Sequence, residues 1–182
     1  VQVHMAGGLP AFSVVGLADK SITESRERVR AALNSLGLSL PPKRITVNLA
    51  PADVQKEGSH FDLPIALALL AEMEAIPRDA LDNYIALGEI SLNGEITFVT
   101  GVLPAAIHAR AQNLGVICPH ANGAEAAWAG EFPILAPSHL LSAIQHFKGE
   151  RILEAPRYTI DTTPFSYPDM RHIEGQQAAR RA

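Results

Sequence analysis

The stretch KRITVNLAPADVQKEGSHFDLPIALALLA, residues 43–71, contains the two periodicities of a mixed fold. Residues 44–49 alternate strictly between polar and apolar side chains, which predicts a half-buried strand. Residues 63–75 are apolar almost all round, which predicts a central helix. Asp62 is expected to be the N-cap of this helix. A strand followed by a buried helix indicates an α/β domain.

Upstream, the pattern predicts two more strands and a helix. Residues 1–5 and 11–15 alternate on either side of the Gly-Gly-Leu-Pro turn at 7–10, which predicts a hairpin. Asp19 is expected to cap a helix that runs to about residue 36.

Downstream, two strands over residues 84–91 and 95–99 are joined through Asn93-Gly94, a typical hairpin turn. Helices and strands then alternate, and Ser138 is expected to cap the last helix. The expected ranges are 102–113 (helix), 116–118 (strand), 121–129 (helix), 133–135 (strand) and 139–147 (helix). This order predicts a mixed sheet covered by helices, in a domain of residues 1–148. Residues 149–182 have no period and are expected to be a linker.

Composition narrows the class of protein. Of 182 residues, 47% are hydrophobic but only 5% aromatic, so the core must consist of Ala, Leu, Ile and Val. The net charge of −4 argues against a protein that coats nucleic acid, although it leaves room for a local basic patch. The single cysteine, Cys118, cannot form an internal disulfide, and no apolar run is long enough for a membrane span. We therefore expect a cytoplasmic protein without a membrane partner, and the start at Val1 suggests that a few residues precede it.

The sequence lacks the common motifs for nucleotide cofactors and for metal ions. Neither G-x-x-x-x-G-K-[ST] nor G-x-G-x-x-G occurs, so we expect no nucleotide cofactor to bind within this chain. Only two of the seven histidines, His139 and His146, are spaced to share a helix face, and no cysteine joins them. We therefore expect no metal site.

The cluster Ser59, His60 and Asp62 invites a hydrolase interpretation. Catalytic triads arise by tertiary convergence, because side chains this close in sequence rarely align nucleophile, base and acid. A structural role at the start of the helix is therefore favoured, with Asp62 as its cap.

A cationic set lies on the first helix and at the start of the central strand. Arg26 falls in the apolar sector of that helix. Its charge must therefore be paired within the domain, reach the solvent by snorkelling, or contact a binding partner. Neutralisation by Glu24 and Glu27 is one interpretation, and contact with a phosphate backbone or a neighbouring subunit is the other. The candidate contact residues are Arg26, Arg28, Arg30, Lys43 and Arg44.

Four stretches together resemble the N-terminal domain of the Mg-chelatase-like AAA+ ATPases, the YifB/ComM family. They are VVGL (14–17) with ESRERVR (24–30), KRITVNLAPAD (43–53), KEGSHFDLPIAL (56–67), and LGEISLNG (87–94) with GVLP (101–104). The resemblance runs from Val1 to about Lys148. The segment DMRHIEGQQAARRA, residues 169–182, is similar to the start of the family's AAA+ module. The resemblance implies a fragment whose partner is its own C-terminal AAA+ module, which would bind ATP and Mg²⁺ and form a hexamer.

The family's domain is in turn similar to the Lon protease domain, a fold of the ribosomal protein S5 domain 2 kind. That similarity implies which positions would hold a Ser–Lys dyad. His60 matches the nucleophilic serine, Ser59 the proline before it, and Leu103 the lysine. The resemblance therefore implies the fold without peptidase chemistry, since an unassisted serine is a weak nucleophile.

Four functions follow as hypotheses. The first is a non-catalytic module for assembly and DNA handling on a hexameric ATPase similar to branch-migration helicases of natural transformation. The second is a protein–protein or ring-assembly module without DNA contact. A residual serine-dependent hydrolase and a magnesium-chelatase subunit are less favoured.

Overall fold

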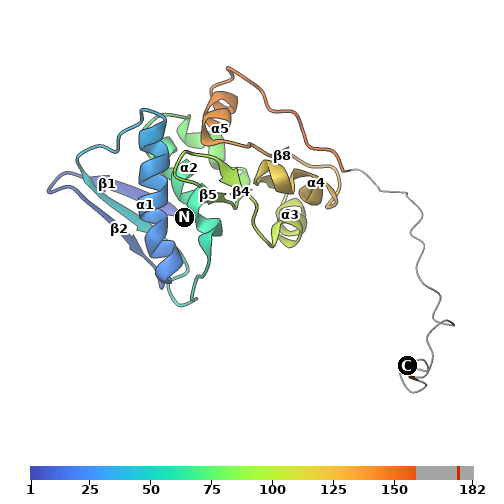
Figure 1. Ribbon diagram of the computed structural model, residues 1–182, viewed down its shortest axis with the longest axis horizontal. Coiled ribbons are helices and arrows are strands. Elements are labelled where there is room, and N and C mark those ends of the chain that lie inside the picture. The colour runs from blue at the N-terminus through green and yellow to red at the C-terminus, as the bar shows by residue number, and fades with distance from the viewer. Residues whose placement is uncertain (159–175, 177–182) are drawn as a thin grey trace.

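The computed structural model describes residues 1–158 and residue 176, and its elements lie in layers (Figure 1). The strands are β1 (Gln2–Ala6), β2 (Ala11–Val15), β3 (Arg44–Asn48), β4 (Tyr84–Ala86), β5 (Glu89–Ile90), β6 (Ile96–Thr97), β7 (Gly115–Ile117) and β8 (Ile134–Leu135). The α-helices are α1 (Lys20–Ser35), α2 (Asp62–Glu72), α3 (Val102–Ala111), α4 (Gly123–Ala127) and α5 (Leu140–Phe147). Short 3₁₀ turns are η1 (Ser59–Phe61), η2 (Arg78–Leu81) and η3 (His120–Asn122). The prediction of an α/β fold is confirmed.

The first sheet has the order β1-β3-β2, with β3 antiparallel to β1 and parallel to β2. The expected hairpin of β1 and β2 is therefore wrong, because β3 lies between them. Residues 7–10 can bridge that gap: four residues reach roughly 13 Å, and strands on both sides of a third are about 9.6 Å apart. Period-2 alternation identifies strands, but it does not identify their neighbours.

Helix α1 matches its prediction at both ends. The Asp19 carboxylate accepts a hydrogen bond from the Ile22 N–H at 2.8 Å. After Leu36, Gly37 adopts φ +74°, and the Leu38 N–H reaches back to the Leu33 carbonyl.

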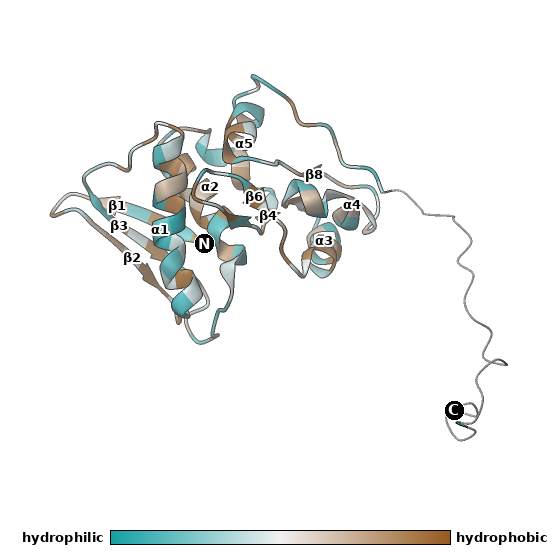
Figure 2. Cartoon of the chain, viewed as in Figure 1, coloured by the Kyte–Doolittle hydropathy of each residue, from teal (hydrophilic) through white to brown (hydrophobic). Residues whose placement is uncertain are grey.

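Helix α2 is central, as predicted, and packs against both β1 and α1, while α1 also contacts β2. Figure 2 shows it as a hydrophobic helix in the interior. Its expected N-cap is wrong: Asp62 is the first helical residue, and Phe61 precedes it without a side-chain cap. The Asp62 carboxylate instead binds Arg28, because a buried charge needs a partner more than the helix needs a cap.

The Asn93-Gly94 turn joins β5 and β6, so this predicted hairpin is confirmed. The single strand expected over residues 84–91 is broken at Gly88 into β4 and β5. Gly88 bonds to the start of α2: its N–H donates to the His60 carbonyl, and its own carbonyl accepts from the Leu63 N–H. A Cβ at Gly88 would lie 2.9 Å from the Leu63 side chain, so only glycine allows this approach.

The second sheet, β4-β7-β8, is entirely parallel. Its two faces belong to different hydrophobic clusters. Ile117 packs with α2 and α5 in the larger one, whereas Val116 and Cys118 pack with α3 and α4 in a cluster rich in alanine. In Figure 1 the first sheet is on the left, α3 and α4 are on the right, and α2 lies between them.

Element ends differ from the expectations by a few residues. Asn113, at φ +58°, ends α3 ahead of the expected stop at Gly115, and α4 is shorter than expected because residues 120–122 form η3. His139 caps α5 in place of Ser138, since its Nδ1 accepts from the Leu141 N–H at 3.1 Å. His139 is thus outside the helix and does not share a face with His146.

The first part of the expected linker packs on the domain. The Leu153 N–H donates to His146 Nδ1 at 3.0 Å, and the Tyr158 ring stacks on Trp128 with centroids 5.0 Å apart. Pro156 lies against Gly123. We call residues 150–158 the strap. The segment 169–182, expected to resemble the start of an AAA+ module, lies outside the described residues except for Gln176. None of the described helices is long and apolar enough to cross a membrane.

Candidate functional site

Three of the five cationic candidates line one groove. Arg26 and Arg30 come from α1, and Lys43 comes from the segment that leads into β3. The groove has a volume of about 690 Å³ and runs between α1, β2 and residues 39–43. Arg26 and Arg30 are four residues apart, so they lie one above the other on the same helix face. We call this feature the basic groove.

The groove carries excess positive charge. Arg26 donates to the Phe12 carbonyl at 3.3 Å and to Glu27 at 3.0 Å, so its guanidinium is held in place. Glu27 is the only carboxylate among the groove residues. Arg30 and Lys43 are exposed, and within the described residues neither side chain forms a hydrogen bond or an ion pair. Two cations are therefore free to meet an anionic ligand.

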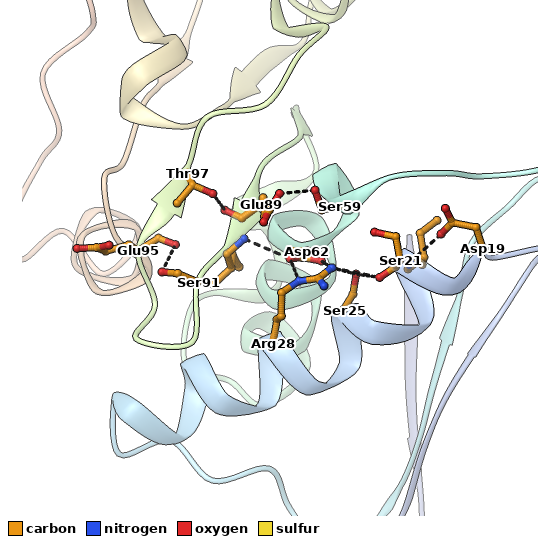
Figure 3. Close-up of polar contacts among 12 residues, drawn as sticks. Asp19, Ser21, Ser25, Arg28, Ser59, Asp62, Glu89, Ser91, Glu95 and Thr97 are labelled. Atoms are coloured by element: carbon orange, nitrogen blue, oxygen red, sulfur yellow. Dashed lines mark hydrogen bonds and ion pairs between the residues drawn. The ribbon is translucent and has the colours of Figure 1, made fainter.

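Arg28 differs from its two neighbours on α1. Its guanidinium binds the Asp62 carboxylate in a bidentate manner, at 2.6 and 2.9 Å. It also donates to the Ser21 carbonyl and the Ser25 hydroxyl (Figure 3). Asp62 is fully buried, and the hydrogen bond to it raises the pKa of Arg28 above its usual value. Arg28 thus holds α1 against α2, while Arg26 and Arg30 face the groove.

Arg44 lies on the other face of the first sheet. In β3, Ile45 and Val47 are buried against the helices, and Arg44 alternates with them on the uncovered face. The structure therefore does not bring Arg44 together with the groove cations. Neighbouring residues on that face are mostly small or polar, and they include His4, Ser13 and Thr46.

The Ser59, His60 and Asp62 cluster does not form a triad. The Ser59 hydroxyl donates to the Glu89 carboxylate (Figure 3). The Asp62 carboxylate is occupied by Arg28 and by the Ile90 N–H at 3.3 Å. No hydrogen bond among the described residues joins the Ser59 hydroxyl to the His60 ring.

His60 and Leu103 fill the positions that the resemblance to Lon assigned to the dyad. The His60 ring stacks against Phe61 with centroids 4.4 Å apart, and desolvation by burial lowers the pKa of His60 below its ordinary value. Leu103 is half-buried and packs against the alanine-rich cluster. The two positions therefore hold neither the serine nor the lysine of a Ser–Lys dyad.

Lys56 is a buried group that the sequence did not single out. Its ammonium donates to the Pro51 carbonyl and to the Val54 carbonyl, the latter at 2.6 Å. The Lys56 backbone also bonds to Leu17 and Asp19. Asp19 adds a second link, because its carboxylate accepts from the Gly58 N–H at 3.2 Å. Together they fix the loop before α2, and this use of backbone carbonyls has no sequence signal.

Among residues 1–158 and 176, no group of three potential metal ligands comes together. The buried Asn122 has a structural role, since its amide bonds to both the N–H and the carbonyl of Val99.

Comparisons with known proteins place the chain in a family. Residues 1–122 match the family model described as subunit ChlI of Mg-chelatase. The chain is 35% identical to the uncharacterized protein YifB of Salmonella typhimurium and 35% identical to the competence protein ComM of Haemophilus influenzae. It is 36% identical to the uncharacterized protein Rv2897c of Mycobacterium tuberculosis.

Each alignment covers 100% of this chain but only 36% or 37% of the relative. The chain thus spans about a third of the length of these relatives. The family match covers residues 1–122 of 182, well over half of the chain. The chain therefore belongs to the family of subunit ChlI of Mg-chelatase, and its resemblance to YifB and ComM is confirmed.

Proposed function

We propose that this chain is the N-terminal module of a Mg-chelatase-like AAA+ ATPase, and that the module handles DNA and assists assembly without catalysis of its own. The observation that carries the DNA part is the convergence of Arg26, Arg30 and Lys43 on one groove. These residues come from two segments of the chain, and they outnumber the single carboxylate there. Similarity to a protein named for competence also supports the DNA-handling part of the proposal.

The remaining parts of the proposal concern the whole protein. An AAA+ module that follows this domain would bind ATP and Mg²⁺, and it would assemble as a hexamer. The strap packs on the domain through Leu153 and Tyr158, which gives a following module a fixed point of attachment. Lack of catalysis is proposed because Ser59 is bonded to Glu89 and the dyad positions hold His60 and Leu103.

A DNA-binding measurement tests the proposal. Fluorescence anisotropy of labelled single-stranded and forked DNA is recorded with the 182-residue chain at 50 and 200 mM salt. We expect binding at the lower salt that weakens at the higher, because phosphate contacts release counterions. Absence of binding to any DNA at 50 mM salt would remove the DNA part.

The second candidate is a protein–protein module without DNA contact, and the uncovered face of the first sheet favours it. Val15, the last residue of β2, is 45% exposed, and Leu17, two residues beyond the strand, is 58% exposed. Light scattering on this chain, alone and joined to its ATPase module, addresses assembly. A monomer in both forms would count against a ring-assembly role.

A residual hydrolase is tested by labelling with an active-site serine probe, which we expect to leave Ser59 unmodified. The chelatase interpretation rests on the family match alone.

A further inference from the structure

Apolar residues form one part of the lining of the basic groove, and we call this part the floor. Phe12 and Ile45 come from the helix-covered face of the first sheet, and Leu40 comes from the segment before β3. Three prolines and Ala11 add apolar lining, whereas Glu27, Asn34 and Ser39 add polar lining; the prolines are Pro10, Pro41 and Pro42. Ile45 is almost fully buried, but Phe12 and Leu40 are only half-buried, so the groove offers some apolar surface between its cations. A ligand that has apolar faces as well as negative charge matches this combination.

The cations of the groove come from two separate segments of the chain. Arg26 and Arg30 belong to α1, whereas Lys43 immediately precedes β3. The Arg26 guanidinium is bonded to the Phe12 carbonyl at 3.3 Å, which places its planar group beside the Phe12 backbone. Aromatic rings and arginine planes are the two surfaces on which nucleic-acid bases stack.

From this arrangement we infer that the basic groove holds a single strand of nucleic acid, with its phosphates at Arg26, Arg30 and Lys43 and a base against Phe12. The inference rests on the proposed DNA-handling function and narrows it. In a duplex the bases are paired and stacked inside, so a duplex touches only the rim and leaves the floor uncovered. A volume of about 690 Å³ suits a few nucleotides of a single strand, but it is too small for a double helix to enter.

The test compares single-stranded and blunt duplex oligonucleotides of equal length, by anisotropy with the 182-residue chain. Arg30→Ala removes an exposed cation without changing the core. Phe12→Leu keeps an apolar side chain of similar volume but removes the ring. Arg44→Ala is the matched control, because it removes the same charge from the opposite face of the sheet.

The wild-type chain should prefer the single strand. Three phosphate contacts predict a log–log salt slope of about −2, or about a 20-fold loss of affinity between 50 and 200 mM salt. Arg30→Ala should reduce that slope by about 0.7. Phe12→Leu should weaken single-strand binding at least about fivefold and leave duplex binding unchanged. Arg44→Ala should leave both unchanged.

Each opposite result overturns a different part. DNA binding that responds to Arg44→Ala but not to Arg30→Ala moves the site to the open sheet face, and the DNA-handling function survives. If duplex and single strand bind with equal affinity and Phe12→Leu has no effect, the single-strand assignment is rejected and the DNA-handling function survives. If polyaspartate competes for the groove as strongly as the unlabelled oligonucleotide does, the ligand would be an acidic peptide and not nucleic acid. Binding to no DNA at 50 mM salt removes the inference together with the DNA part of the proposed function.

Discussion

The sheet β1-β3-β2 is covered by helices on one face only, whereas β4-β7-β8 is covered on both. Their sequences reflect the difference. In β3, buried Ile45 and Val47 alternate with polar residues, while Val116, Ile117 and Cys118 are all buried. Parallel sheets between helix layers are buried on both faces, so they leave no room for polar side chains. The first sheet therefore has an uncovered face with room for polar side chains, whereas the second sheet is enclosed by apolar packing.

The largest expected difference between the two sheets is the loss of stability caused by a new charged side chain. Val116→Asp and Ile117→Asp point to opposite faces of β7, and each should cost several kcal/mol because either carboxylate is buried without a partner. Thr46→Asp, on the open face of β3, should cost only about 1 kcal/mol, the span of strand propensity. Urea unfolding followed by circular dichroism measures all three. Equal tolerance at Val116 and Thr46 would refute the contrast.

The Arg28–Asp62 ion pair joins the helices of the first half. Asp62→Ala should destabilise the domain by about 3–5 kcal/mol, because it leaves the guanidinium partly buried without its partner. The double variant Arg28→Met/Asp62→Leu should recover much of this loss, since apolar replacements of a buried pair are often neutral. The same unfolding assay compares the two. A double variant less stable than Asp62→Ala would mean that the pair is needed for more than its charges.

Gly88 marks the boundary between the second sheet and the β5–β6 hairpin. Gly88→Ala should cost about 1–3 kcal/mol, because the new methyl group would overlap Leu63 and Ile96. Gly149→Ala is the control: a Cβ there meets no atom within 4 Å, so only the backbone strain of φ +73° is tested. A smaller effect at Gly88 than at Gly149 would show that the start of α2 yields easily to the added group.

The strap should respond weakly to pH through His146, whose pKa is lowered by desolvation. The folded state then binds fewer protons than the unfolded one. This contribution to stability is present above the ordinary pKa of 6.5 and is lost as the pH falls through the lower folded value. Protonation also removes the acceptor for the Leu153 N–H. Fluorescence of Trp128, the single tryptophan, reports on its stacking with Tyr158.

His146→Gln is the control for this titration. It should remove the pH-dependent change of Trp128 fluorescence below pH 6.5, the ordinary histidine value. Persistence of the same change in His146→Gln would assign it to another group. His60, whose pKa is also lowered by burial, affects stability in the same direction but lies at the start of α2, away from the strap.

Periodicity predicted most elements of the fold but not how strands pair. Residues 44–49 and the helix after Asp19 follow from local pattern and capping, and both are found as expected. The hairpin of β1 and β2 failed because pairing is non-local, and insertion of β3 leaves the alternation of both neighbours unchanged. The break at Gly88 was hidden because it depends on contact with Leu63, far away in the sequence.

The candidate site shows the same division. The sequence by itself determined which cations are available, which catalytic motifs are missing and, through four long motifs, the family. Only the tertiary structure decided that Arg28 turns inward to Asp62, that Arg44 lies on the far face, and that Arg26, Arg30 and Lys43 share a groove. The physical reason is that a side chain's charge is a local property, whereas its partner depends on which distant segment the hydrophobic core brings beside it.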